Sequence, residues 1–176
     1  KAAPNLEIRI DSSDPANVPG EILVRGANVF LGYFKNDDAT DSVFTDDGWF
    51  KTGDMGVIDE DGCLFIKGRT KCMILGPSGQ NIYPEEVETV INSQPYVVDS
   101  LVVEDNGGLT ALIYPDFAQG AKDGMNQDVF IKFMEDTLPE LNKELPNYAK
   151  LKKIEIMSED FERTPKKSIK RYLYQR

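Results

Sequence analysis

The feature of this sequence that most constrains its fold is a change of pattern near residues 68–71. Up to residue 67 the chain consists of short apolar runs separated by turns rich in Asp, Gly and Pro, without a long helical pattern. After residue 71, amphipathic helical segments alternate with nearly continuous apolar runs. We therefore predict an α+β chain, in which a small β-barrel-like or sandwich-like segment is followed by a mixed α+β domain.

The first part is predicted to be built from short strands. Residues 5–10 read as a half-buried strand, because apolar residues alternate there with charged ones, and residues 21–25 read as a second strand. Residues 55–58 and 63–67 are expected to pair around the turn Asp59–Gly62, in which glycine suits a positive φ.

The second part is predicted to centre on a hairpin. Residues 97–103 and 109–114 are almost wholly apolar, which is typical of strands buried on both faces. A helix over residues 84–93 precedes them and begins with Pro84, which has no N–H to leave unsatisfied in a first turn. A short strand is expected over residues 71–75.

Further helices are expected toward the C-terminus. Asn126 is a suitable N-cap for one of them. The inward-facing side chains of that helix are expected to be Val129, Phe130, Phe133 and Met134. A last helix is expected to begin near Lys167.

Composition excludes several classes of function. The 176 residues carry a net charge of −10, which argues against nucleic acid as a partner. The exception is the tail from Arg163 to Arg176, which holds six Lys or Arg and no acid. By itself such a tail is most simply a solvated helix end. No apolar run approaches the ~20 residues that span a bilayer.

The residue types also limit the chemistry. There is no His, which removes any Ser-His or Cys-His catalytic pair. Cys63 and Cys72 are too few and too far apart for a zinc site, and they suit a reducing, cytoplasmic setting. Chemistry in this chain must therefore use Lys, Arg and carboxylates.

Five short motifs lie between residues 20 and 88. They read Gly20-Glu21-Ile22, Gly32-Tyr33, Thr52-Gly53-Asp54, Gly68-Arg69-Thr70-Lys71 and the segment from Gly79 to Glu88. A carboxylate and a guanidinium that both lie on turns suit a ribose or phosphate ligand better than a core. In their order and spacing the five motifs resemble the adenylate-forming enzymes, most closely the long-chain fatty acyl-CoA synthetases.

The resemblance implies an activity and a domain organisation. In that family an acid and ATP give an acyl-adenylate, with Mg²⁺ on the leaving pyrophosphate, and the thiol of coenzyme A then displaces AMP. Residues 1–68 would be the β-rich end of the large N-terminal, AMP-binding domain. Residues 69–71 would be the hinge, and residues 72–176 the small C-terminal domain that rotates between the two half-reactions.

The resemblance also assigns roles to single residues. Asp54 and Arg69 match residues that bind the nucleotide ribose, Lys71 matches the hinge, and Gly79 lies in the loop that lines the coenzyme A channel; no residue matches a metal ligand. Each has a plainer explanation. Asp54 could bind its own backbone in a turn, Arg69 could form a surface ion pair, Lys71 could end a strand, and Gly79 could satisfy turn geometry.

The match breaks down near the C-terminus. The family has a lysine there that reaches the substrate carboxylate and the α-phosphate, and Ser168 stands at its position. We assign the role to the adjacent Lys167, with Lys166 and Lys170 as alternatives.

The family's phosphate loop, acyl pocket and magnesium ligands have no counterpart in this sequence, which begins with Lys1. We therefore expect a piece of a longer ligase that does not turn over alone and holds no cofactor tightly. Its partners would be the missing N-terminal domain, fatty acid, ATP and coenzyme A, with peripheral membrane association a further expectation. The alternatives are a peptide-synthetase adenylation domain, a luciferase-like enzyme, or a non-catalytic interaction module that kept the fold.

Overall fold

The computed structural model describes residues 3–176 and divides the chain into two compact units, with the boundary between Met73 and Ile74. Both units combine strands with helical segments, so the predicted α+β class is confirmed. No helix in the described residues is both long enough and apolar enough to cross a membrane.

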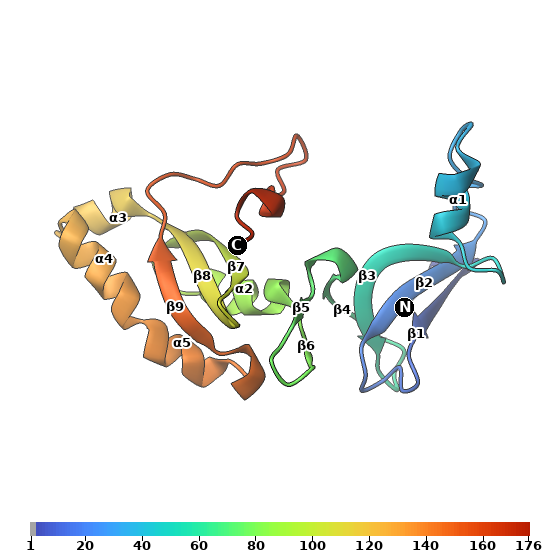
Figure 1. Cartoon of the computed structure of the whole chain (residues 1–176), viewed down its shortest axis with the longest axis horizontal. Coiled ribbons are helices and arrows are strands. Elements are labelled where there is room, and N and C mark those ends of the chain that lie inside the picture. Colours follow the sequence, from blue (N-terminus) through green and yellow to red (C-terminus); the bar gives the residue numbers. More distant parts are fainter. Residues whose placement is uncertain (1–2) are drawn as a thin grey trace. The chain divides into compact units, whose positions relative to one another are not determined.

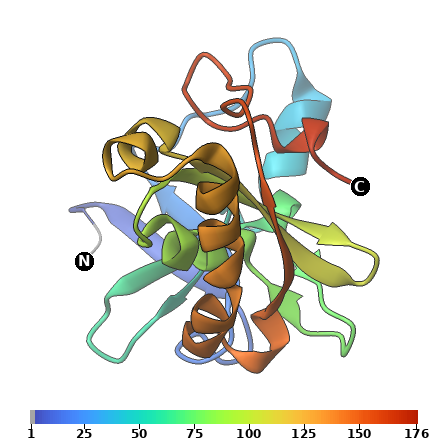
Figure 2. The same cartoon turned by 90° about the vertical axis from the view of Figure 1, so that its left-hand side faces the viewer.

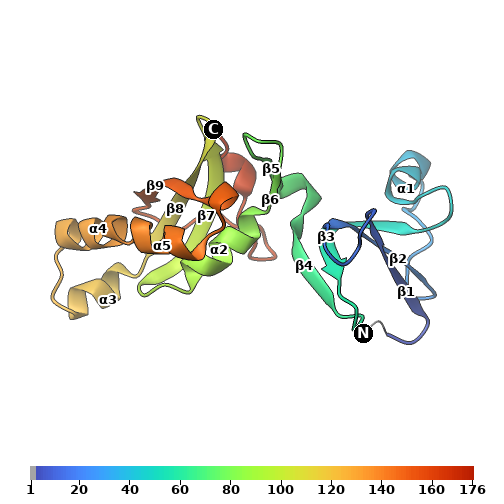
Figure 3. The same ribbon diagram turned by 90° about the horizontal axis from the view of Figure 1, so that it is seen from below.

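The first unit is a four-stranded antiparallel sheet. Its strands are β1 (Leu6–Asp11), β2 (Gly20–Gly26), β3 (Phe50–Ile58) and β4 (Leu64–Arg69), in that order across the sheet. Each strand pairs with its neighbour in sequence, and the β3–β4 turn places Gly62 at φ 74°, as predicted. The helix α1 (Asp37–Val43) lies at one end of the sheet (Figure 3).

The expectation of a barrel-like segment is wrong in one respect. A barrel closes only when its first and last strands pair. In the part of the chain that the structure describes, β1 and β4 are the two edges of an open sheet. Four short strands joined in sequence give a meander, and no register links its edges.

The second unit begins with a small hairpin and is organised on a three-stranded sheet. The hairpin consists of β5 (Ile74–Leu75) and β6 (Asn81–Ile82). In the sheet, β8 (Gly108–Pro115) is central, antiparallel to β7 (Val97–Asp105) and parallel to β9 (Leu151–Ile156). The predicted central hairpin is confirmed, and its turn has positive φ at Asn106 and Gly107, the conformation that Asn-Gly favours.

Helices cover one face of this sheet. They are α2 (Pro84–Asn92), α3 (Phe117–Lys122), α4 (Gln127–Asp136) and α5 (Leu138–Glu144), and the short 3₁₀ turn η2 (Asn147–Ala149) leads into β9. Figure 2 shows the helices of this layer in front of the strands. Their apolar side chains form one core with the sheet, centred on Ile91, Ile113, Phe130, Met134 and Leu141.

The C-terminal tail covers the opposite face. After β9 the chain crosses the sheet on the side away from α4 and α5 (Figure 1). Phe161 is buried there with Leu101, Val103 and Leu112, and Tyr174 packs on the same cluster. β7 and β8 are therefore buried on both faces, as their apolar runs predicted.

Three local predictions were wrong. Residues 71–75 are not one strand, because Met73 N–H donates to the Arg69 carbonyl and closes the 3₁₀ turn η1 (Thr70–Cys72) before β5 begins. No helix begins at Lys167, because a tight turn occupies that position and only the short η3 (Arg171–Leu173) follows. In α4, Val129 and Phe133 are 52% and 41% exposed, since only the narrow stripe of Phe130 and Met134 faces the core.

Candidate functional site

In the first unit the structure brings Asp54 and Arg69 together. They are direct partners in the β3–β4 register, and Arg69 Nε lies 2.8 Å from Asp54 Oδ1. Their side chains are 30% and 63% exposed, respectively. Because an exposed ion pair of this kind stabilises a fold by about 1 kcal/mol at most, folding alone does not require it.

The backbone around Asp54 is held firmly. Thr52 Oγ donates to the Ile22 carbonyl and accepts from the Asp54 N–H, at 2.8 and 3.1 Å. Gly53 has φ 74° and donates its N–H to Glu21 Oε1 at 3.0 Å. The Thr-Gly-Asp motif therefore lies inside β3, at an irregularity, and not in the separate turn that the sequence suggested.

Lys71 lies at the predicted hinge position. It is the middle residue of η1, exposed, two residues before the end of the first unit. The strand end considered as its plainer explanation is therefore not what the structure shows. Its role as a pivot stays a prediction, as do the domain boundaries at residues 69–71.

Gly79 lies in the β5–β6 turn with φ 82°. Its N–H donates to the Gly76 carbonyl, and Gly76 N–H donates to the Gln80 carbonyl, at 2.9 and 2.8 Å. A Cβ at Gly79 would meet nothing within 4 Å, so the backbone conformation, and not crowding, favours glycine there. Turn geometry by itself thus accounts for this residue.

The same loop borders a cavity of about 450 Å³ within the second unit. Pro77, Ser78 and Gln80 line one side of the cavity, and Tyr148, Lys150 and Lys152 line another. The wall combines backbone and apolar side chains with two lysines and one carboxylate, Glu104, so its side-chain charge is positive by one and it can accept an anionic ligand.

In the second unit, ion pairs fasten the basic tail to the domain. Four of its six cations have acidic partners, and the nearest distances are 2.7 Å for Arg163–Asp99, 3.0 Å for Lys170–Glu162 and 2.5 Å for Arg176–Glu155, with Arg171 bonded to Glu88. Without these ion pairs, the positive charges of the tail would repel one another. The contacts therefore explain how the basic tail can pack on the sheet.

The ion pairs and burial shift the pKa values of three carboxyl groups that contact the tail or lie in it. Hydrogen bonds from Arg176 and Lys153 lower the pKa of the Glu155 carboxyl to about 2. The Arg163 guanidinium holds the pKa of the Asp160 carboxyl below its ordinary value. Burial raises the pKa of the Glu88 carboxyl, while Arg171 and the N–H of Val102 act in the opposite direction.

Lys166 and Lys167 differ from the other cations of the tail. Both are exposed, and within residues 3–176 neither takes part in an ion pair. Two ammonium groups without an acidic partner, next to four that are neutralised, are available to an anionic ligand.

These two lysines lie on a tight turn. Arg163 and Ile169 form an isolated bridge, Thr164 N–H donates to the Ser168 carbonyl, and Lys167 N–H donates to the Thr164 carbonyl, both at 2.8 Å. Pro165 suits the second position of such a turn, and Lys167 closes it at φ 64°, where glycine is normally preferred.

The sequence did not reveal the partners of the tail. Asp99, Glu88 and Glu155 lie on β7, α2 and β9, far from the tail along the chain. The one signal was compositional, since six cations without an acid need acidic neighbours from elsewhere if they are to pack on a protein surface.

Comparison with known proteins places the chain in a family. Residues 73–176 match the model of the AMP-binding enzyme C-terminal domain, so the chain belongs to that family. This confirms the resemblance to adenylate-forming enzymes.

The curated relatives of the chain are CoA ligases. It is 49% identical over 86 residues to the long-chain-fatty-acid–CoA ligase FadD15 of Mycobacterium tuberculosis, covering 49% of this chain and 14% of the relative. It is 47% identical over 89 residues to the 2-succinylbenzoate–CoA ligase of Bacillus cytotoxicus, covering 51% and 18%. The chain thus spans less than a fifth of the length of these relatives.

Solved structures show the same likeness. O-succinylbenzoate coenzyme A synthetase from Bacillus subtilis, in complex with ATP and magnesium ion, is similar with a TM-score of 0.79 and 29% identity, covering 98% of this chain and 34% of that one. ATP-bound MatB from Rhodopseudomonas palustris is similar with a TM-score of 0.76 and 33% identity over the same shares.

Proposed function

We propose that this chain is the C-terminal part of an AMP-forming acid–CoA ligase, which makes an acyl-adenylate from an acid and ATP and then a thioester with coenzyme A. The observation that carries this proposal is the pair of unpartnered lysines on the turn Thr164–Ser168, in a tail whose other cations are neutralised. Transfer at an α-phosphate develops negative charge, and a cation held in advance at that position stabilises it.

Lys167 is the residue to which we give that role. An L-residue at positive φ is unfavourable by roughly 1 kcal/mol, and glycine at this position would relieve the strain. A strained backbone that presents an exposed cation is more easily understood as functional than as structural. Lys170 is the weaker alternative, because it already pairs with Glu162 at 3.0 Å.

Asp54 and Arg69 would bind the nucleotide ribose. A carboxylate can accept from both ribose hydroxyls, and the adjacent guanidinium fixes its orientation. Both side chains are exposed enough to be reached. Within residues 3–176 no cluster of three acidic or sulfur side chains could hold a metal, so Mg²⁺, which neutralises the leaving pyrophosphate, would be bound elsewhere in the protein.

Coenzyme A would enter along the β5–β6 loop that contains Gly79. The adjoining cavity offers Lys150 and Lys152 to the phosphates of that substrate. Lys150→Glu in the full-length protein is expected to raise the KM for coenzyme A without changing acyl-adenylate formation; an unchanged KM would contradict this placement.

Lys71 would be the pivot between the two half-reactions. Lys71→Pro fixes one φ and should therefore affect acyl-adenylate formation and thioester formation very unequally. Equal losses in both half-reactions would count against Lys71 as the pivot.

For the acid we propose a fatty acid, which the likeness to the long-chain ligase supports. The similar likeness to the 2-succinylbenzoate ligase makes an aromatic acid the alternative.

A second candidate function has one observation in its favour. Ser168 occupies the position where the adenylate-forming enzymes carry their lysine, which fits a non-catalytic module that kept the fold. The sequence of the parent open reading frame distinguishes a ligase from a non-catalytic module, because an active ligase needs an upstream phosphate loop and acyl pocket.

The decisive experiment compares lysine variants of the full-length protein by acid-dependent pyrophosphate release. Lys167→Gly keeps the turn, because glycine tolerates φ 64°, and removes only the cation. We expect acyl-adenylate formation to fall by about 10²–10³, the usual cost of losing one preorganised charge. The matched controls Lys166→Ala and Lys170→Ala should cost less than tenfold. Wild-type rates in Lys167→Gly would refute the assignment.

A further inference from the structure

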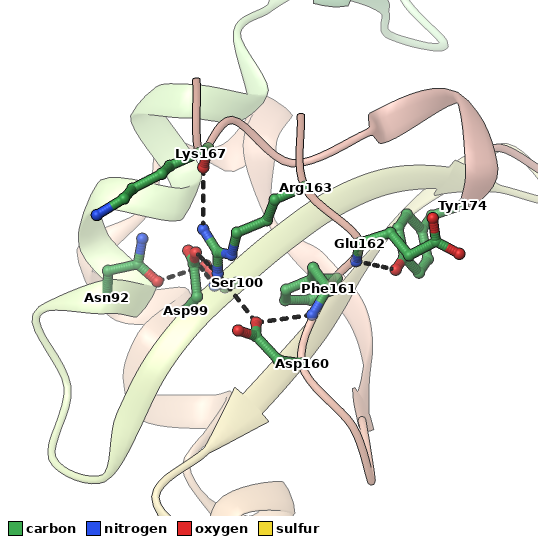
Figure 4. A network of polar contacts seen from close by, with 9 residues as sticks. All are labelled: Asn92, Asp99, Ser100, Asp160, Phe161, Glu162, Arg163, Lys167 and Tyr174. Carbon is green, nitrogen blue, oxygen red and sulfur yellow. Dashed lines mark hydrogen bonds and ion pairs between the residues drawn. The ribbon is translucent and has the colours of Figure 1, made fainter. Parts of the chain in front are cut away.

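Arg163 stands at the base of the turn that carries Lys167 and reaches three different acceptors. Its NH1 group donates to the Lys167 carbonyl at 3.3 Å. Its NH2 group donates to Asp99 Oδ2 at 2.7 Å and to Asp160 Oδ1 at 2.9 Å. Figure 4 shows the guanidinium between the turn and the two carboxylates, with the Lys167 side chain extending away from it.

The acceptors on the domain side are themselves held in place. The Ser100 N–H donates to Asp99 Oδ1 at 2.9 Å, and the buried Ser100 hydroxyl donates to Asn92 Oδ1 at 2.8 Å. Asn92 ends α2 and Asp99 lies in β7. A continuous set of hydrogen bonds therefore leads from the helix, through the sheet, to the Lys167 carbonyl (Figure 4).

The tail on either side of the turn is also fixed. Asp160 accepts from the Phe161 N–H at 2.7 Å, and the Tyr174 hydroxyl accepts from the Glu162 N–H at 2.8 Å. Phe161 and Tyr174 meet edge to face, with ring centroids 5.3 Å apart. The base of the turn is thus rigid, and the direction of Lys167 depends on how its own peptide group is held.

We propose that Arg163 is a positioning residue that aims the Lys167 ammonium, by fixing the peptide group that follows Lys167 and tying it to Asp99. This rests on the proposed function of Lys167. A guanidinium serves here because its planar fork can donate in several fixed directions, whereas an ammonium is a point donor on a flexible stem. Arg163 is 31% exposed at its side chain, so the network is partly shielded from water.

The test is Arg163→Lys in the full-length protein, with Arg176→Lys as matched control. Arg176 belongs to the same tail and likewise bridges two carboxylates, Glu155 and Asp105, but does not contact the turn. We expect Arg163→Lys to lower kcat of acyl-adenylate formation about tenfold and to change KM for ATP less than twofold. The reason is that a misplaced Lys167 ammonium would stabilise the transition state less well, while the binding of ATP in the ground state would be unaffected. Arg176→Lys should change both by less than twofold.

A double variant shows whether Arg163 acts through Lys167. If it does, Arg163→Lys should cost nothing more once Lys167→Gly is present, because coupled residues are not additive. A further tenfold loss in the double variant would overturn the proposal, as would Arg163→Lys kinetics equal to those of Arg176→Lys. If Lys167→Gly alone is fully active, the proposed function fails instead.

Amide hydrogen exchange tests the proposal without an activity assay. In the chain of residues 1–176, the Lys167 amide donates to the Thr164 carbonyl. Arg163→Lys should speed hydrogen exchange at this amide several-fold and leave it unchanged at Val102, which Glu88 holds in the sheet. Unchanged exchange at Lys167 would show that Arg163 does not hold the turn.

Discussion

The two units differ in how their sheets are covered. In the second unit the helices cover one face of the sheet and the tail covers the other, and the two faces form separate buried clusters. In the first unit only a few apolar side chains are buried, and Leu31 and Phe34 are 99% and 89% exposed. Among the largest fully buried side chains of the described residues, only Leu23 belongs to the first unit.

This difference between the units indicates which parts of the chain stabilise the fold and which parts are available for other roles. Most of the largest fully buried side chains of the described residues belong to the second unit, and burial of apolar surface is the main stabilising contribution to a fold. The same unit carries, in its tail, Lys167 at positive φ, a conformation that is unfavourable by itself. The first unit exposes large apolar side chains together, which is typical of a surface that another part of a protein covers. We therefore expect the second unit to be the more stable of the two when each is measured separately.

The largest expected effect is in the core of the second unit. Phe130 is 1% exposed and packs edge to face against Tyr96 and Phe117. Phe130→Ala should lower the free energy of unfolding of this unit by about 3–5 kcal/mol. Far-UV circular dichroism during urea unfolding measures it, and Val129→Ala, at a half-exposed neighbour, should cost less than about 0.5 kcal/mol.

The variant Phe130→Ala also tests whether the two units unfold independently. Trp49 is the only tryptophan and lies in the first unit, so its fluorescence reports on that unit alone. If the units are independent, Phe130→Ala leaves the Trp49 transition where it was. A transition that moves together with the circular dichroism would show one cooperative unit.

The next effect concerns the ion pair between α2 and the tail. Glu88 is 8% exposed, accepts from the Val102 N–H at 2.7 Å and bonds Arg171. Glu88→Gln leaves the Arg171 charge without its nearest carboxylate and should cost about 2 kcal/mol, measured by urea unfolding. Glu140→Gln, in an exposed pair with Lys143, is the control, and an equal loss there would contradict the special role of Glu88.

The pH dependence of the second unit should reflect Glu155. Its folded pKa of about 2 lies below the ordinary value of 4.5, so the charged form stabilises the fold above about pH 4.5, and this stability is lost as pH falls toward 2. After allowance for solvent screening, the loss is about 1 kcal/mol. Thermal unfolding of wild type and Glu155→Gln between pH 2 and pH 6 measures it. The variant should be less stable at pH 6 and nearly equal at pH 2; a constant difference would contradict the assignment.

The smallest effect is in the first unit. Trp49 is buried, and the guanidinium groups of Arg9 and Arg25 lie over its ring, 4.6 and 4.5 Å from the ring centroid. Arg9→Gln should lower the stability of this unit by about 0.5–1 kcal/mol, seen in the Trp49 fluorescence transition. Lys35→Gln, beside the exposed Phe34, should have a smaller effect, and a larger one would indicate that the exposed aromatic surface is ordered by its own contacts.

Much of the fold could be predicted from local sequence. The hairpins at Asp59–Gly62 and Asp105–Gly108, the Asn126 cap and the helix at Pro84 are all present, because each depends on residues that are close along the chain. The predictions that failed depend on distant contacts. Val129 is exposed because the sheet offers α4 only a narrow contact, and the expected helix at Lys167 is replaced by a turn that Arg163 ties to β7.

The sequence by itself determined the α+β class, the change of pattern near residues 68–71, and the motifs that resemble adenylate-forming enzymes, since these follow from local patterns and residue types. Only the tertiary structure decided which cations of the tail are neutralised and which are available. Charges far apart along the chain pair only when the fold brings their elements together, so no local pattern reveals that Arg163 pairs with Asp99 and Arg171 with Glu88 while Lys167 forms no ion pair within the described residues.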